Sequence, residues 1–427
     1  MGPMQMLRVT AGVMTCLAAL STSLLAGGGP AAAASAPGVS ASVVKLGIPY
    51  IDFASLTSLG VNLNEGNWPD AYKALIANIN AHGGVDGRKL VPYFAAVNPT
   101  GSTAAATACT QLVEDDDVFV AIGPEQVNCY VNQYHIDAIN GLMETSMPNS
   151  AANFTLIPPF QTYDPLQLSL FDKEGVFKGK KVGVFAGTLA DDDELTAVKS
   201  ELKKLHVDVV QSAVDSAPAT DQAAEYENVQ IIAQRFMSDG INEVVAVGTG
   251  SAVWPKAESG NQSTYNPSWI ATQGEGVLGT IDTGGSNSVS PRYLKNMLAS
   301  VPVPSYVQMW KNPAVQKCVA IVKKAYPSDA IATPTPTTPG SGETYEAVVQ
   351  ACQNLAMFTD IAAASGKHLT TESFTHAGYG LRDVSFPGLG GPVSFGHDQP
   401  AALGQVYKLY YDGSTNTLAI SNTSLTK

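Results

Sequence analysis

Residues 77–90 read ANINAHGGVDGRKL, and this short stretch decides the fold. Before it, apolar residues recur at helical spacing over residues 68–81, and the glycine pair at 83–84 predicts the end of that helix. The Asp-Gly pair at 86–87 predicts a turn, and the apolar run at 90–94 predicts a strand. A helix followed closely by a strand is the repeating unit of an α/β protein.

The same alternation continues on both sides of this stretch. We predict strands at 43–48, 118–122, 180–186, 207–210, 242–247 and 269–271, with helices at 103–113, 194–205 and 229–238. The last third predicts a long helix at 344–364 and a closing hairpin at 406–411 and 417–420. The chain therefore predicts two α/β units in series, each with helices on both faces of its sheet and with ligands expected at the carboxyl ends of the strands.

The composition describes a well-buried globular protein of more than one domain. Of its 427 residues, 45% are hydrophobic and only 14% are charged, which does not suit a disordered chain. The formal net charge of −13 argues against binding to nucleic acid or to an anionic lipid surface, because both need a basic face.

The first 36 residues differ from the rest and predict a secretory signal peptide. Arg8 precedes an apolar run over 9–26, and the small residues Ala34-Ser35-Ala36 resemble a cleavage site. An N-terminal membrane anchor is the alternative interpretation, and Cys16 lies in a poor match to a lipidation motif. We expect an exported protein that is periplasmic, attached to the cell surface or extracellular. Association with the membrane is compatible with each of these locations.

Four cysteines remain after that segment, at 109, 129, 318 and 352. An even number in an exported chain predicts two disulfides, for which three pairings exist. Proximity in sequence favours Cys109 with Cys129 and Cys318 with Cys352. A zinc site is the alternative, but the cysteines lack CxxC spacing.

Several motifs resemble those of the type I solute-binding proteins of ABC importers, the group that includes the branched-chain amino acid-binding proteins. Residues 77–90 match that family's first helix, glycine turn and second strand. Ile122-Gly123-Pro124, Thr344-Tyr345-Glu346-Ala347 and the GGPVSF run at 390–395 also fit, in the family's order along the chain. A cysteine near the second helix that pairs with one after the third strand is a further family feature.

The resemblance implies two Rossmann-like three-layer lobes joined by three hinge crossovers, with the ligand between the lobes. It places the crossovers near 160–164, 281–291 and 386–391. The first lobe would then comprise residues 43–162 and 291–386, and the second lobe residues 163–290 and 387–427. Hinge closure around the ligand is the expected motion.

Candidate ligand-binding residues follow predicted strands or lie at the first crossover. Those of the first lobe are Tyr50, Glu125, Gln126, Asn128, Asn149 and Ser150, and Tyr163 lies at the crossover. Amino acid-binding members of the family usually have small hydroxyl residues where this chain has Glu125, which would repel a ligand carboxylate. Several ligand classes are therefore compatible with the sequence: amino acid-like, amide, polyol, sterol-derived and cationic.

In the second lobe the candidates are Asp191, Trp254 and Glu275. Asp191 belongs to a run of three acids, which can also serve only as a helix N-terminus. Trp254 could cover an apolar face of a ligand. By the resemblance, Glu275 holds a ligand's ammonium group.

No catalytic motif supports an enzyme, and we expect neither a cofactor nor a metal. The literal GxGxxG at 274–279 lacks the strand–turn–helix context of a dinucleotide site. The expected function is delivery of a small solute to an ABC permease. A ligand-sensing receptor for a signalling partner is the main alternative, and a secreted α/β hydrolase is a third. The sequence leaves open the ligand, signal cleavage and the oligomeric state.

Overall fold

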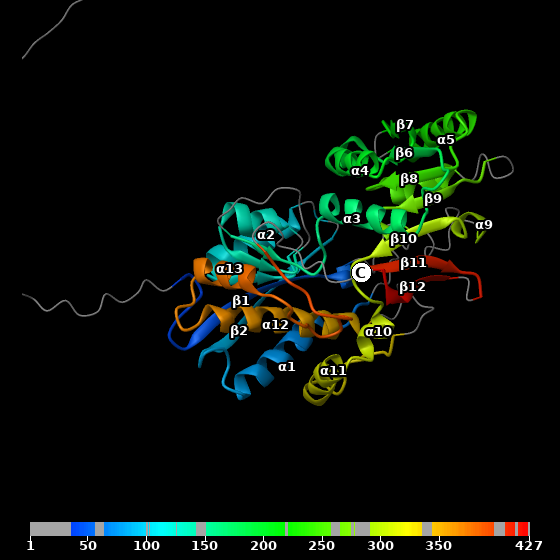
Figure 1. The fold of residues 1–427 in the computed structure, drawn as a ribbon. Coiled ribbons are helices and arrows are strands. Elements are labelled where there is room, and N and C mark those ends of the chain that lie inside the picture. The colour runs from blue at the N-terminus through cyan, green and yellow to red at the C-terminus, as the bar shows by residue number, and fades with distance from the viewer. Residues whose placement is uncertain are drawn as a thin grey trace, which may run out of the picture. The chain divides into compact units, whose positions relative to one another are not determined.

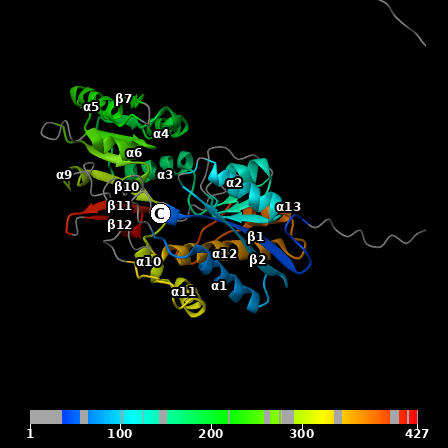
Figure 2. The same ribbon diagram turned by 180° about the vertical axis from the view of Figure 1, so that it is seen from behind.

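The structure is a computed structural model that describes residues 36–55, 64–99, 101, 103–124, 126–141, 151–217, 221–257, 265–274, 277, 291–334, 344–396, 406–414 and 417–425. The described residues form two separate sheets, which define a first and a second lobe (Figures 1 and 2). The predicted signal peptide lies almost wholly outside the described residues. No helix in the described part of the chain is long and apolar enough to cross a membrane.

The first lobe contains a parallel sheet of five strands in the order β2-β1-β3-β4-β5. Its strands are β1 (Val43–Ile51), β2 (Lys89–Val97), β3 (Val120–Ile122), β4 (Asp137–Ile139) and β5 (Asn153–Phe154). One face is covered by α1 (Trp68–Ala81), α11 (Pro313–Ala325), α12 (Glu346–Ser365) and α13 (Thr371–Gly380). The other face is covered by α2 (Ala104–Thr110), η2 (Gln111–Asp115) and η3 (Cys129–Gln133). A short helix, α10 (Tyr306–Trp310), precedes α11.

The second lobe contains a mixed sheet in the order β12-β11-β10-β9-β8-β6-β7. Five strands are parallel: β6 (Val182–Ala186), β7 (Val209–Val214), β8 (Glu243–Val247), β9 (Ser268–Ala271) and β10 (Met297–Val301). The hairpin of β11 (Tyr407–Asp412) and β12 (Thr417–Ser424) adds antiparallel strands beside β10. The helical elements are α3 (Phe160–Lys173), η4 (Leu189–Asp191), α4 (Asp192–Lys204), α5 (Gln222–Ser238), α6 (Gly250–Val253), η5 (Trp254–Ala257) and α9 (Pro291–Leu294).

Two apolar cores sandwich the second sheet. One contains side chains of α3 and α4, and the other contains side chains of α5, η5 and α9. The fold class predicted from the sequence is therefore confirmed: two α/β lobes, each with helices on both faces of a mainly parallel sheet.

The stretch at 77–90 forms the predicted structures. Asn67 caps α1 by accepting a hydrogen bond from Asp70 N at 3.1 Å, and the helix ends at the glycine pair. Gly84 has a φ of +70°, and a Cβ there would lie 1.9 Å from the carbonyl oxygen of Arg88. Only glycine fits such a close approach of two backbone segments.

Two of the expected lobe boundaries are wrong. We expected the chain to return to the first lobe at residue 291, but β10 pairs with β9 and therefore belongs to the second lobe. We also expected residues after 386 to join the second lobe, but Val393 and Phe395 are buried in the core of the first lobe. The reason is that short apolar segments are compatible with either core, and only strand pairing and burial decide between them.

Candidate functional site

Polar side chains gather where the parallel strands of the second sheet end. Because β6, β8, β9 and β10 are parallel neighbours, their carboxyl ends lie at one edge of the sheet. Ligands of open α/β sheets bind at this edge. We call the following residues the acidic edge: Asp164, Asp191, Glu194, Gln273 and their hydrogen-bonding partners.

Asp191 ties two loops of this edge together. Its Oδ2 accepts hydrogen bonds from Gly187 N at 3.1 Å, Thr188 N at 3.2 Å and Thr249 Oγ1 at 2.8 Å. The side chain connects the loop after β6 to the turn after β8, and the residue is only 6% exposed. The predicted candidate thus lies at the expected edge, where its carboxylate holds the loops in place.

Glu194 lies one turn further along the chain, in the first turn of α4. Unlike its exposed neighbours Asp192 and Asp193, it is half-buried, and its carboxylate accepts hydrogen bonds from Gln273 Nε2 at 3.1 and 3.3 Å. Burial, with a smaller contribution from the charge of Asp191, raises the pKa of Glu194 to about 7. The Gln273 hydrogen bond opposes this rise. Gln273 lies two residues after the end of β9, and its own backbone N donates to Ser251 Oγ at 3.0 Å.

Asp164 is fully buried near the N-terminus of α3. Its Oδ1 accepts a hydrogen bond from Gln167 Nε2 at 3.1 Å, and Gln167 also donates to the carbonyl of Thr272 at 2.8 Å. Its Oδ2 has no partner among the described residues. Burial raises the pKa of Asp164 well above its usual range, and the charges of Glu194 and Asp191 raise it further, while hydrogen bonds from the side chains of Thr272 and Gln167 oppose the rise.

Tyr163 belongs to the same network. Its hydroxyl lies 2.8 Å from Ser300 Oγ, and Ser300 in turn donates to Gln167 Oε1 at 3.1 Å. Tyr163 also lines a small cavity of about 20 Å³ together with Thr272, Gln273 and Ser300. Such a cavity has room for about one water molecule.

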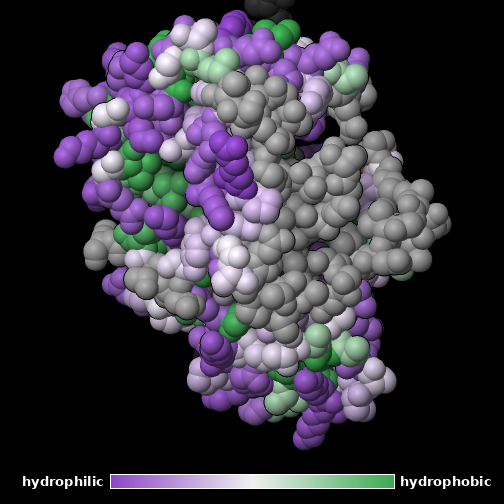
Figure 3. Space-filling view, turned by 90° about the vertical axis from the view of Figure 1, so that its right-hand side faces the viewer, coloured by the Kyte–Doolittle hydropathy of each residue, from purple (hydrophilic) through white to green (hydrophobic). Residues whose placement is uncertain are grey.

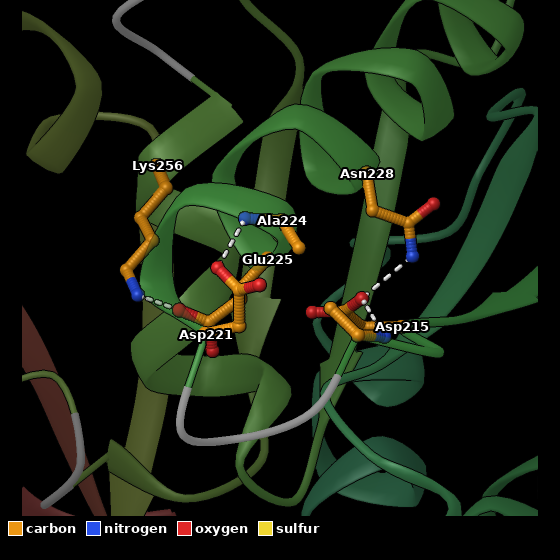
Figure 4. A network of polar contacts seen from close by, with 7 residues as sticks. Asp215, Asp221, Ala224, Glu225, Asn228 and Lys256 are labelled. Atoms are coloured by element: carbon orange, nitrogen blue, oxygen red, sulfur yellow. Dashed lines mark hydrogen bonds and ion pairs between the residues drawn. The ribbon is translucent and has the colours of Figure 1, made fainter.

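A separate polar network lies at the end of β7 (Figure 4). Asp215 accepts hydrogen bonds from Asn228 Nδ2 at 2.6 Å and from Ala217 N at 2.9 Å. Lys256 forms an ion pair with Glu225 in the first turn of α5. These contacts fix α5 against its neighbouring loops.

The first lobe has a large hollow at the end of β1. It has a volume of about 800 Å³ and is lined by Tyr50, Asp52 and Phe53, by the start of α1 and by residues at the ends of α11 and α12. This volume lies within the usual range for small-molecule sites. The ring of Tyr50 makes an edge contact with Phe94, with the ring centroids 6.5 Å apart.

The other candidates of the first lobe are placed as follows. Asn128 precedes η3, and its side-chain oxygen accepts a hydrogen bond from Asn132. Gln126 is partly buried in the loop after β3. Glu125, Asn149 and Ser150 lie outside the described residues, as does Glu275 in the second lobe.

Trp254 is a core residue. It has no exposed surface, and its ring packs against Phe185 at 5.3 Å and against Phe236 at 5.8 Å between ring centroids. The expectation that Trp254 faces a ligand is therefore wrong for this structure, because apolar side chains from β6 and α5 surround it. The sequence does not show whether an aromatic residue that follows a strand points into the core or toward a ligand.

Two disulfides are present, and they are the pairings that proximity in sequence favours. Cys109 is bonded to Cys129, and Cys318 is bonded to Cys352. Within the described part of the chain, no group of three Asp, Glu, His or Cys side chains converges closely enough to hold a metal ion.

The sequence did not single out Glu194, Gln273 or the amides of the first lobe. Asn140 follows β4, and its Nδ2 donates to Asn354 Oδ1 at 2.9 Å, while Asn354 donates to the hydroxyl of Tyr72 at 2.8 Å. Its position two residues after the predicted strand at 269–271 could have identified Gln273. The other contacts join residues that are more than two hundred positions apart, which a single sequence does not reveal.

Comparison with protein families identifies the class of protein. The model of the family described as "Periplasmic binding protein" matches residues 53–411. The chain therefore belongs to the periplasmic binding protein family. No curated protein sequence is a detectable relative of this chain.

Solved structures of substrate-binding proteins share the fold. A fatty acid ABC transporter substrate-binding protein from Thermomonospora curvata is 16% identical with a TM-score of 0.56, over 91% of this chain and 94% of that one. An ABC transporter solute-binding protein from Rhodopseudomonas palustris HaA2, in complex with p-hydroxybenzoic acid, is 14% identical with a TM-score of 0.59, over 90% and 96%. A possible leucine/isoleucine/valine-binding protein from Rhodopirellula baltica SH 1 is 13% identical with a TM-score of 0.54, over 89% and 96%.

Proposed function

We propose that this chain is an exported solute-binding protein that captures a small polar molecule between its lobes and delivers it to an ABC permease. The observation that carries the proposal is the acidic edge, where polar side chains from several loops converge at the carboxyl ends of parallel strands. That is the position at which α/β folds bind ligands. The family, whose members bind small molecules, supports a binding function rather than catalysis.

Within this proposal, the binding residues come from both lobes. We retain Tyr50, Glu125, Gln126, Asn128, Asn149, Ser150, Tyr163, Asp191 and Glu275 as candidates, add Glu194 and Gln273, and remove Trp254. Ligand capture would bring the first-lobe residues toward the acidic edge by movement at the crossovers.

The first test is a thermal-shift screen of the purified protein against amino acids, amides, polyols, aromatic acids and amines. A ligand that binds only the folded state adds about 2.7 kcal/mol of apparent stability at a hundredfold excess over Kd. We expect a clear rise in Tm for one chemical class, and a decrease in the radius of gyration by X-ray scattering when that ligand closes the lobes. Absence of any shift across all five classes would contradict the proposal.

The permease is tested separately, by co-purification from membranes with the identified ligand present and absent. Recovery of an ABC permease supports transport. Recovery of a sensor kinase instead would favour the alternative of a ligand-sensing receptor.

A further inference from the structure

Exposed apolar side chains gather on one part of the second lobe. Six large hydrophobic side chains are exposed in the described part of the chain, and four of them belong to β7 and α5: Val210, Tyr226, Ile231 and Met237. Ile231 is the most exposed of these four, at 54%. Single exposed apolar residues are common on protein surfaces, but a group of them marks an interaction surface.

β7 and α5 are neighbours at one end of the second lobe (Figures 1 and 2). Ala213 of β7 packs against the apolar core that contains Val229 and Phe236 of α5. β7 is an outer strand of its sheet, and its sequence, VVQSAV, contains no charge and no proline. The outer strand β2 of the first sheet contains Lys89 and Pro92. Residues of those types protect a strand edge from contact with other chains, and β7 lacks them.

Two charged residues of α5 flank Ile231 symmetrically. Glu227, Ile231 and Arg235 are four residues apart and exposed, and this spacing places them on one face of the helix. We call these three residues the α5 stripe. Neither Glu227 nor Arg235 forms an ion pair within the part of the chain that the structure describes. An acid one turn before Ile231 and a base one turn after it make the stripe complementary to itself when two copies of the helix run antiparallel.

We propose that the α5 stripe binds the same stripe of a second copy of this chain, so that the protein forms a homodimer with a two-fold axis at Ile231. The two Ile231 side chains then contact each other, and Glu227 of each copy forms an ion pair with Arg235 of the other. The helix end that carries Tyr226 lies beside the end of the second helix that carries Met237. Dimerisation thereby removes apolar surface from water.

The charge pattern favours a second copy over a different partner. The formal net charge of −13 makes most contacts between two copies repulsive. The α5 stripe is neutral and places opposite charges together, and the uncharged β7 beside it adds no repulsion. A strongly acidic or strongly basic partner would match only one of the two charged residues. The stripe contains no candidate ligand-binding residue, so this inference does not depend on the proposed function.

Sedimentation equilibrium of the purified protein over a range of concentrations measures self-association. We expect an equilibrium between monomer and dimer. Ile231→Glu places two like charges at the two-fold axis and should raise the Kd of the dimer about tenfold or more. The Tm of the variant at low protein concentration, where the dimer has dissociated, reports any change in folding.

Reversal of the charges tests the antiparallel arrangement. Glu227→Arg alone and Arg235→Glu alone each place like charges opposite each other twice per dimer, so each should weaken dimerisation. The two substitutions combined bring opposite charges together again and should restore it. This rescue cannot arise within one chain, because the two residues are about 12 Å apart along the helix. Lys203→Glu is the matched control, since it reverses an exposed base in the last turn of α4, as Arg235→Glu does in α5.

A protein that sediments as a monomer at every concentration would overturn the proposal. A dimer that tolerates Ile231→Glu would do the same, as would single reversals that the combined variant fails to rescue. If Ile231→Glu alters the Tm, the charge reversals still test the proposal. None of these results bears on ligand binding, so the proposed function is tested only by the ligand screen.

Discussion

At the turn after β8, Gly248 has a φ of +57°, and a Cβ built on it would lie 2.5 Å from Asp191 Cγ. Both facts demand glycine, because the left-handed conformation is strained for other residues and the space is already filled by a carboxylate. The bare backbone at 248 therefore allows the Asp191 side chain to reach Thr249 and connect two loops of the acidic edge.

We predict that Gly248→Ala destabilises the protein more than Gly240→Ala. Gly240 has a φ of +71°, but an added Cβ there comes no nearer than 3.7 Å to the end of a lysine side chain. The conformational cost is about 1 kcal/mol at either position, and Gly248→Ala adds roughly 1–3 kcal/mol for displacing Asp191. Urea denaturation of the two variants measures the difference. Equal losses of unfolding free energy in the two variants would show that the contact with Asp191 does not contribute to the cost of Gly248→Ala.

At the scale of elements, the two disulfides join helices that the fold brings together. Cys318 on α11 is bonded to Cys352 on α12, and Cys109 on α2 is bonded to Cys129 at the start of η3. Both bonds lie in the first lobe, one on each face of its sheet. Each bond closes a loop of moderate length, with sequence separations of 34 and 20 residues.

We predict that removing either disulfide costs a similar amount of stability, about 3–4 kcal/mol, although the loops differ in length. The reason is that loop entropy rises only with the logarithm of loop length. The test replaces each cysteine pair by alanine and compares the free energies of unfolding. If only one replacement lowers the free energy of unfolding, packing around that disulfide, rather than the entropy of the unfolded chain, determines its contribution to stability.

At the scale of the whole molecule, hydrophilic residues predominate among the coloured atoms of the face in Figure 3, and hydrophobic ones form small separate patches. Several carboxyls are nevertheless buried inside. Asp137, at the start of β4, is buried and accepts hydrogen bonds from Ala152 N at 2.7 Å and Thr375 Oγ1 at 2.8 Å. Burial raises the pKa of Asp137 to about 7, against the opposing effect of those hydrogen bonds.

This shift predicts how stability depends on pH. A carboxyl whose pKa is raised in the folded state stabilises that state while it is protonated, and the contribution is lost as the pH rises from about 4 to about 7. We therefore expect Asp137→Asn, which cannot ionise, to gain stability relative to the natural protein by on the order of 2 kcal/mol between pH 5 and pH 7. Melting curves over pH 5–8 measure this difference. Asp208→Asn, at an exposed position, is the control and should give a constant difference. A constant difference for Asp137→Asn as well would contradict the prediction.

The sequence by itself determined the fold class, because hydrophobic periodicity and turn residues are local properties of the chain. The helix at 68–81 and the hairpin near the C-terminus form as predicted, with strand ends that differ by a few residues. It also placed Asp191 at the edge where polar side chains meet, because Asp191 lies in the loop after a strand of the second sheet. Tyr163, which meets Ser300 there, was expected only from the family resemblance, at the first crossover.

Only the tertiary structure decided which lobe contains β10 and which contains the segment around Phe395. It also decided which way each loop side chain points. Trp254 and Glu194 illustrate the difference: both lie in loops or helix starts after strands, but one packs in the core and the other meets Gln273 at the acidic edge. The physical reason is that strand pairing and burial depend on residues distant in sequence, so the surroundings of a side chain are set by the assembled fold and not by its neighbours along the chain.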